Sequence, residues 1–110
     1  MRIQIATRNG DVPETVRDRA RTQVERLTRY EPRLSSAEIV FDEERHIRKV
    51  EGILSVDGSA PVVASGEGDD FRPALDQMLD RVSRMLRRQR DQRTDHKAPR
   101  REGGDRVVGD

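Results

Sequence analysis

The sequence predicts an α+β domain with the element order β-α-β-β-β-α, in which two helices pack on one face of a four-stranded sheet. Three observations support this fold class. Two stretches carry apolar residues at helical intervals of three and four. Short segments rich in β-branched residues precede and separate them. The chain has 110 residues, of which 32% are hydrophobic, so it has room for one small domain with a thin core.

The first predicted strand is residues 2–7, RIQIAT, in which Ile3 and Ile5 alternate onto one face. A helix is predicted over residues 13–30, with Pro13 in its first turn. Its apolar residues recur at spacings of four, four, three and three, at Val16, Ala20, Val24, Leu27 and Tyr30. Pro32 ends this helix, because a residue that precedes proline is disfavoured in helical geometry.

Three further strands are predicted at residues 37–43, 48–56 and 61–66. In the second of these, apolar residues share one face, at Val50, Leu54 and Val56. The dipeptide Asp57-Gly58 then provides the strongest short hairpin signal in the chain, so the last two strands are expected to pair with each other.

The second predicted helix runs from Phe71 to about Gln92, after an acidic turn at residues 67–70. Asp70 fits a helix N-cap, and Pro73 fits the first turn. The apolar face that should enter the core consists of Phe71, Leu75, Met78, Leu79, Val82, Met85 and Leu86. Because periodicity is lost from Thr94 onwards, we expect a folded domain over residues 1–93 and a disordered tail, or the start of a linker, over residues 94–110.

The charges nearly balance, since 22 basic residues face 21 acidic ones, and composition alone does not predict nucleic-acid binding. The distribution of the charges along the chain does predict it. In residues 80–93, DRVSRMLRRQRDQR, six residues are arginine. The helix dipole accounts for one or two cations in a last turn, whereas Arg81, Arg84 and Arg88 share one flank over two turns. The pattern favours an anion-binding stripe over a solvated helix.

The first predicted helix adds to this surface. Arg19 and Arg26 lie on one of its flanks, and Arg17 and Arg21 lie on the other. If the helices pack side by side, one flank of each can join into a basic strip. Because the acids cluster in turns, a nearly neutral domain is expected to be strongly polarised, and a polyanion would recognise that polarity.

Several segments carry a resemblance to a known family. They are IQIAT in the first strand, ETVR and ERLTRY in the first helix, the Asp-Gly hairpin, and VASGEGDDFRPALDQMLDRVSRMLRR, which is the most specific. Together they resemble the short domain of the ribosome hibernation-promoting factors, also called ribosome-associated inhibitor or protein Y. The likeness covers residues 2–92. The chain departs from the family pattern at Pro13, Gln23, Arg72 and Pro73, which puts single contacts in doubt more than the fold.

The resemblance implies a non-enzymatic hibernation factor that binds the small ribosomal subunit in the channel for messenger and transfer RNA. Translation would be inhibited sterically, under stress or in stationary phase, with 16S ribosomal RNA as the partner and no cofactor. The family's RNA-binding residues fall at Arg17, Arg26 and Arg29 in the first helix and at Arg81, Arg84, Arg88 and Arg90 in the second. Long members carry a separate C-terminal dimerisation domain, and the sequence leaves open whether this chain is a short-type protein or part of a long one.

Other function classes fit less well. A general double-stranded RNA-binding module without ribosome preference is the alternative, although such modules usually begin with a helix. An enzyme is not expected, because His46 and His96 lack a partner at catalytic or metal-ligating spacing and the chain has no cysteine. Base stacking is not expected either, since Tyr30, Phe41 and Phe71 are predicted in or near the core. No apolar run resembles a signal peptide or a membrane span, so a cytoplasmic protein is expected.

Overall fold

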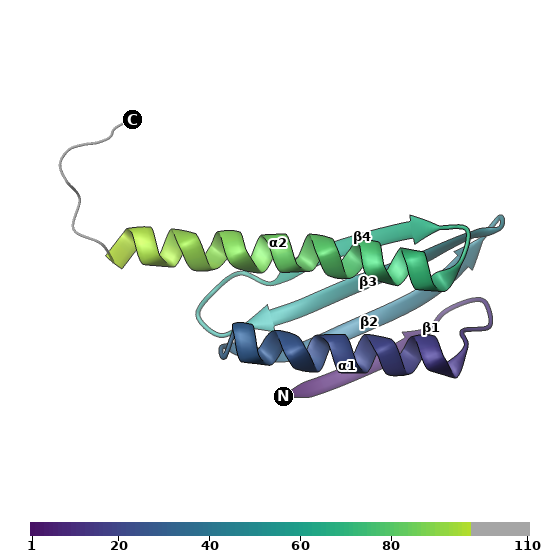
Figure 1. Ribbon diagram of the computed structural model, residues 1–110, viewed down its shortest axis with the longest axis horizontal. Coiled ribbons are helices and arrows are strands. Elements are labelled where there is room, and N and C mark those ends of the chain that lie inside the picture. Colours follow the sequence, from purple (N-terminus) through teal and green to yellow (C-terminus); the bar gives the residue numbers. More distant parts are fainter. Residues whose placement is uncertain (98–110) are drawn as a thin grey trace.

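Six elements follow one another in the predicted order (Figure 1). The computed structural model describes residues 1–97, with side chains as far as Gln92. The elements are β1 (Arg2–Thr7), α1 (Glu14–Tyr30), β2 (Leu34–Glu44), β3 (Ile47–Val56), β4 (Val62–Gly68) and α2 (Phe71–Lys97). None of the helices among these residues is long and apolar enough to cross a membrane.

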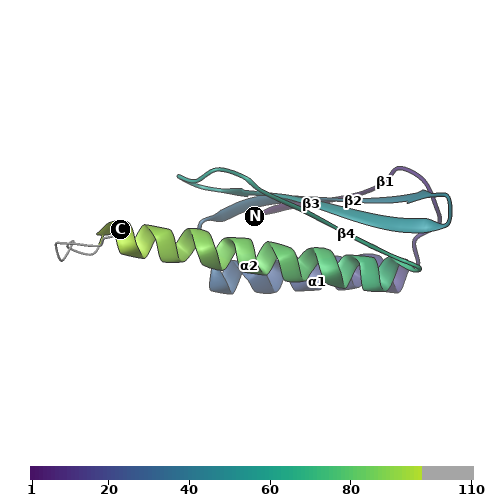
Figure 2. The same cartoon turned by 90° about the horizontal axis from the view of Figure 1, so that it is seen from above.

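The four strands form one mixed sheet in the order β1-β2-β3-β4. The strands β1 and β2 are parallel, so α1 serves as the crossover between them, and the other two pairs are antiparallel. Both helices lie on the same side of the sheet, and no helix or strand of the described residues covers its opposite side (Figure 2). The predicted two-layer architecture is therefore confirmed.

The core fills the space between the helices and the inner face of the sheet. Strand alternation directs Ile39 and Phe41 of β2, with Val50 and Leu54 of β3, toward the helices, and all four are buried. Phe71 packs edge-to-face on Phe41, with ring centroids 5.7 Å apart. The buried residues of the two helices are Val16, Ala20, Val24, Phe71, Ala74, Leu75, Met78, Val82 and Leu86. The predicted apolar stripes of both helices enter the core, except for Tyr30 at the end of α1.

Two glycines allow α2 to approach the sheet closely. A Cβ at Gly66 of β4 would lie 2.7 Å from the Met78 backbone nitrogen and would also collide with the Ala74 carbonyl oxygen. A Cβ at Gly52 of β3 would lie 2.6 Å from the Met78 sulfur. Gly66 therefore requires glycine because the helix backbone occupies the space, whereas a side chain at Gly52 would require the flexible Met78 side chain to move.

The helix ends differ slightly from the predicted ones. Pro13 is the N-cap of α1 and lies just outside the helix, where its carbonyl oxygen accepts hydrogen bonds from the Val16 and Arg17 amides. Glu31 is extended and ends α1, as predicted from Pro32. Asp70 precedes α2, and its carboxylate accepts a hydrogen bond from the Phe71 amide at 2.9 Å.

Two boundaries near α2 fall later than expected. The strand β4 continues to Gly68, so only the last two residues of the predicted acidic turn separate it from the helix. The helix continues to Lys97, because no glycine or proline occurs between Pro73 in its first turn and Pro99. The predicted tail thus begins inside the helix, and its remainder, residues 98–110, lies outside the described residues.

The expected pairing of the last two strands is confirmed, but Asp57-Gly58 does not form a two-residue hairpin. Asp57 and Gly58 start a five-residue connection, in which Gly58 has φ +77° and the Ser59 amide donates to the Val56 carbonyl. The tight two-residue hairpin instead joins β2 to β3 at Arg45 and His46, whose φ values are 53° and 69°. Positive φ at both positions is typical of a type I′ turn, which usually contains asparagine and glycine. Two residues with side chains therefore hold left-handed conformations there.

Candidate nucleic-acid interface

The outward surface of α1 and α2, here called the helical layer, carries an excess of positive charge. Eleven arginines and six acids lie in residues 14–30 and 71–92, which makes this layer basic although the chain as a whole is nearly neutral. Arginines can bind phosphate groups through bidentate hydrogen bonds. The positions and existing partners of the arginines decide which of them are available for such contacts.

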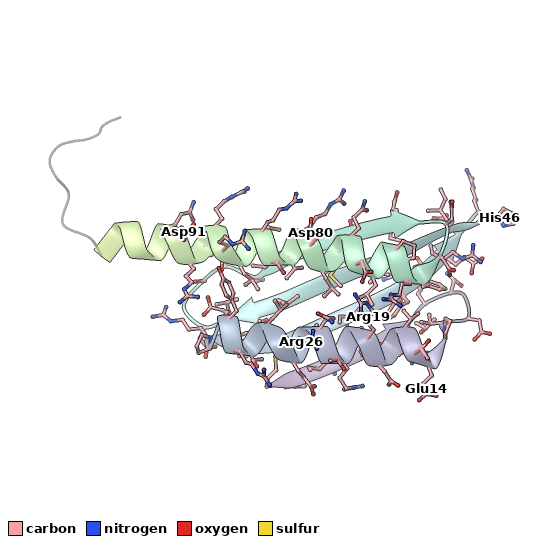
Figure 3. The ribbon with its side chains drawn as sticks, in the orientation of Figure 1. Glu14, Arg19, Arg26, His46, Asp80 and Asp91 are labelled. Atoms are coloured by element: carbon pink, nitrogen blue, oxygen red, sulfur yellow. The ribbon has the colours of Figure 1, made fainter. Side chains whose placement is uncertain are left out.

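An ionic cluster joins the two helices at the end near the β2–β3 hairpin. The Arg19 Nε lies 2.9 Å from Asp76 Oδ1, and Arg72 approaches the other oxygen of the same carboxylate at 3.8 Å. Figure 3 shows the Arg19 side chain in the space between the helices. Arg26 lies two turns further along the same flank of α1, as their seven-residue spacing requires. Arg19 thus joins the two helices, whereas the guanidinium of Arg26 has no hydrogen bond or ion pair to another described residue.

Arg90 occupies the other end of the space between the helices. Its guanidinium donates to the Tyr30 carbonyl oxygen at 3.0 Å and lies 5.0 Å from the centre of the Tyr30 ring. It therefore satisfies a carbonyl at the C-terminus of α1 and stacks on an aromatic ring. Tyr30 itself is 36% exposed, so it lies near the core and not in it. Tyr30 is the last residue of α1, and its ring contacts Arg90.

The predicted stripe of Arg81, Arg84 and Arg88 lies on the flank of α2 above the edge strand β4, here called the β4-side flank. Arg81 donates to the Ser65 carbonyl oxygen at 2.7 Å. Arg84 pairs with Asp80 at 2.8 Å, one helical turn away, and 67% of its side chain is exposed. Arg88 lines a shallow depression with Pro61 and Val62 at the start of β4. The three side chains share a flank, as the helical spacing predicts.

Arg81 also has a structural task on this flank. The strand β4 is at the edge of the sheet, so its backbone groups on the open side have no neighbouring strand. Arg81 binds the Ser65 carbonyl, and Gln77, one turn earlier in α2, accepts a hydrogen bond from the Glu67 amide at 2.9 Å. Two helix side chains therefore replace the contacts that another strand would make. This role lowers the availability of Arg81 for phosphate.

The first helix divides its arginines between two sides. Arg17 donates to the Thr7 hydroxyl at 2.8 Å, which places it on the β1 side, away from α2. Arg21 follows one turn later on that flank. Arg29 and, on α2, Arg87 are exposed at helix positions opposite the buried stripes.

The structure therefore does not bring all seven predicted residues together in one strip. The flank of α2 that faces α1 carries Arg90, whereas Arg81, Arg84 and Arg88 face the other way, over β4. Arg17 lies on the opposite border of the layer. The predicted residues instead lie along both borders of the helical layer and along its middle.

Within the described part of the helical layer, and apart from Arg21 on the β1 side, four arginines have guanidinium groups without a hydrogen bond or ion pair to another residue. They are Arg26, Arg29, Arg87 and Arg88. Arg87 was not among the residues predicted to bind RNA. Sequence could not separate free from tied arginines, because the tying partners Thr7, Ser65 and Tyr30 are 10 to 60 residues away along the chain.

The acids on the sheet side form a separate environment. Asp42 accepts hydrogen bonds from Asn9 at 3.0 Å, from the Glu43 amide at 2.9 Å and from Arg8 at 3.3 Å. The Asn9 hydrogen bond is the main cause that holds the pKa of Asp42 below its ordinary value, and partial burial opposes this shift. No group of three metal-ligating side chains occurs among the described residues. His46 lies in the exposed β2–β3 turn (Figure 3).

Comparisons with known proteins agree with this architecture. Residues 3–94 match the family model described as Sigma 54 modulation protein / S30EA ribosomal protein. A protein of Azotobacter vinelandii named ribosome hibernation promoting factor is 33% identical over 86 residues, which are 78% of this chain and 79% of the relative. A protein of the same name from Salmonella typhimurium is 28% identical over 96 residues, which are 87% of this chain and 100% of the relative.

Two solved structures share the fold. A ribosomal subunit interface protein from Coxiella burnetii superposes with a TM-score of 0.75 at 20% identity, over 83% of this chain and 99% of the other. The N-terminal domain of Protein Y from Thermus thermophilus gives 0.70 at 24% identity, over 80% of this chain and 98% of the other. With the family model matching most of the sequence, the predicted resemblance is confirmed: the chain belongs to the Sigma 54 modulation protein / S30EA ribosomal protein family.

Proposed function

We propose that this protein is a ribosome hibernation factor that binds the small ribosomal subunit in the channel for messenger and transfer RNA and blocks translation by occupying it. The observation that carries the proposal is the family match over residues 3–94, together with relatives named ribosome hibernation promoting factor. A ribosome-associated role follows from this membership. Proteins of this family are non-enzymatic binding proteins, so no substrate is turned over.

The helical layer is the surface that suits ribosomal RNA. Arg26, Arg29, Arg87 and Arg88 present free guanidinium groups there, and Arg84 is held only by an exposed pair with Asp80. Such an exposed pair contributes about 0 to 1 kcal/mol, so a phosphate can replace the carboxylate at little cost. Binding would be driven by arginine–phosphate contacts and the release of counterions, and its affinity would fall steeply with salt.

Recognition would depend on the shape of the folded RNA. Phe41 and Phe71 are buried, and Tyr30 lies beneath Arg90, so the three aromatic side chains are not available as a stacking platform for unpaired bases. Structured RNA offers phosphates and a shallow minor groove to a surface of this kind. The alternative, a general double-stranded RNA-binding module, gains no support, because the relatives described above carry ribosome-related names.

The proposal predicts co-sedimentation of the protein with purified small subunits and reversible inhibition of a purified translation system. Excess messenger and transfer RNA should displace the protein, because they share the channel. At the same salt concentration, the affinity for a simple RNA duplex should be at least about tenfold lower than the affinity for small subunits. Equal affinity for duplex and subunit would support the general RNA-binding alternative. Inhibition that persists after removal of the protein would contradict the steric mechanism.

We further expect a cytoplasmic protein that acts under stress or in stationary phase, without a cofactor. If the natural chain is longer, we expect a separate C-terminal dimerisation domain, as the resemblance implies, in addition to the unit described here. The RNA-binding set proposed for this chain is Arg17, Arg26, Arg29, Arg81, Arg84, Arg88 and Arg90, with Arg87 added from the structure. Within it, Arg26, Arg29, Arg84, Arg87 and Arg88 should contribute most.

A further inference from the structure

The side of the sheet opposite the helices, here called the outer face, combines exposed apolar side chains with carboxylates. Val40, Ile53 and Val63 lie on neighbouring strands: Ile53 pairs directly with Val63 and with Glu38, and Val40 is the next residue after Glu38 on this face. Val63 is 49% exposed, and Ile47 near the hairpin is 50% exposed. A sheet face that meets only water usually carries polar side chains at these positions. The apolar centre therefore suggests a partner.

The charges around this centre are mainly negative. Glu38, Asp42, Glu44, Glu51 and Glu67 alternate onto the outer face, against Arg2, Lys49 and Arg8, which pairs with Asp42. Glu38 pairs across the sheet with Ile53, and Glu51 pairs with Val40, so carboxylates directly border the apolar residues. A depression of about 340 Å³ near the hairpin is lined by Asp42, Glu44 and Glu67, with Arg45, Ile47 and Lys49.

These features select the chemical class of the partner. RNA does not fit, because its phosphates would meet carboxylates in place of arginines. A second copy of the chain could match the negative charge of the outer face only with its helical layer. Such a head-to-tail contact would occupy the surface needed for RNA and would not close into a symmetric pair. An extended, Lys/Arg-rich protein segment with an apolar side chain matches both the charge and the apolar centre.

We propose that the outer face docks a Lys/Arg-rich protein segment of the small ribosomal subunit while the helical layer contacts RNA. The inference rests on the proposed function, because protein segments embedded in RNA are rich in lysine and arginine, which neutralise phosphates. Two weak contacts on opposite faces of one rigid domain reinforce each other, since the first raises the effective concentration of the second. The outer face would also orient the domain, because it repels RNA on that side.

The test uses charge reversal on the outer face, Glu38→Lys with Glu51→Lys. Binding is measured to intact small subunits and to protein-free 16S ribosomal RNA. We expect the double variant to bind intact subunits roughly tenfold more weakly, because lysines would face a basic segment. Its binding to protein-free RNA should stay unchanged or become tighter. Circular dichroism and the melting temperature establish that this variant and its control remain folded.

The matched control is Asp18→Lys with Glu25→Lys, which makes the same charge change on the exposed side of α1. This control should bind intact subunits as tightly as the wild type or more tightly, because its new charges face RNA. Opposite signs for the two variants support the inference. Equal or tighter binding of Glu38→Lys/Glu51→Lys to intact subunits overturns the inference alone. Failure of the wild-type protein to bind subunits overturns the proposed function and the inference with it.

A second measurement does not depend on charge reversal. A photoreactive benzoylphenylalanine at Val63, in the otherwise native chain bound to purified small subunits, reports what contacts the apolar centre. A crosslink to a Lys/Arg-rich segment of a ribosomal protein, identified by mass spectrometry, supports the inference. A crosslink to 16S ribosomal RNA, a crosslink to this chain itself, or no crosslink despite subunit binding overturns it.

Discussion

The helical layer and the outer face differ in charge and in how their charged groups are held. Eleven arginines dominate the helices, whereas Glu38, Asp42, Glu44, Glu51 and Glu67 dominate the outer face. On the helices, several arginines are free and others are tied to backbone carbonyls. On the outer face, Asp42 is the carboxylate with the most partners, since Asn9, Arg8 and the Glu43 amide all donate to it.

This difference shows how a net charge of +1 can conceal a polarised surface. Residues on a helix return to one face every three or four positions, whereas residues on a strand alternate at every second position. The fold therefore sorts charges that are interleaved along the chain into two layers. Substitutions in each layer can show how the layers are held together and which of their charges are available.

The largest expected effect concerns the close packing of α2 against the sheet. Gly66→Ala should lower the free energy of unfolding by about 3 kcal/mol, because the new methyl group would collide with the backbone of Ala74 and Met78. Urea denaturation measures this change. Gly68→Ala is the matched control, since its Cβ would meet its nearest atoms at 3.4 Å, an ordinary contact. Equal stability of the two variants would show that the helix is not seated on Gly66.

A smaller, stabilising effect is expected at the β2–β3 turn, on the side of the outer face. Replacing Arg45 with asparagine and His46 with glycine should raise the free energy of unfolding by about 1 to 2 kcal/mol, because both positions have positive φ. The melting temperature reports the gain. Affinity for small subunits should not fall, because neither residue belongs to the helical layer and the change removes a positive charge beside the outer face. A destabilised variant would argue that the turn is held by the side chains it has now.

On the β4-side flank, Arg81 is expected to contribute mainly to stability and Arg88 mainly to subunit binding. Arg81→Ala should cost about 1 kcal/mol of stability, because the Ser65 carbonyl at the sheet edge loses its donor. Arg88→Ala should change stability by less than about 0.5 kcal/mol and should weaken subunit binding more than Arg81→Ala does. Thermal unfolding and subunit binding are measured on both variants. The same loss of affinity with no loss of stability in Arg81→Ala would assign Arg81 to RNA.

The smallest expected effect is the pH dependence due to Asp42. Its pKa is lower in the folded protein than the ordinary value of 3.8, so its ionised form stabilises the fold above that value. This contribution is lost as the pH falls through the lowered folded pKa. Asp42→Asn removes it, so the stability difference between wild type and variant should be largest above about pH 5 and should shrink below pH 3.8. A difference that does not vary with pH would contradict this assignment.

Sequence was sufficient for the fold because local patterns determine it. The apolar spacing from Val16 to Leu27 and from Phe71 to Leu86 predicted which face of each helix is buried. The alternation of apolar residues over 48–56 predicted which face of β3 is buried. The hairpin at Arg45 and His46 was missed because its residues lack the usual turn chemistry, and the conformation is imposed by the pairing of β2 with β3.

The candidate site was only partly predictable. Helical periodicity placed Arg81, Arg84 and Arg88 on one flank, and the structure has them there. Periodicity does not say which flank faces the neighbouring helix, because that depends on the crossover from β1 to β2. It also could not reveal that Arg90 binds the end of α1 or that Arg81 protects β4, since both hydrogen bonds join distant parts of the chain.

We propose above all that arginines of the helical layer that are free, or held only by an exposed ion pair as Arg84 is, bind the small ribosomal subunit. The measurement that tests it most directly is the salt dependence of subunit affinity for the wild type and for Arg84→Gln/Arg87→Gln/Arg88→Gln. We predict weaker binding and a slope lower by roughly three, about one for each phosphate that is no longer bound by an arginine. The control Arg2→Gln/Arg33→Gln/Arg45→Gln removes equal charge outside this layer and should keep the wild-type slope. If both triple variants show the wild-type affinity and slope, the helical layer is not the ribosome-binding surface.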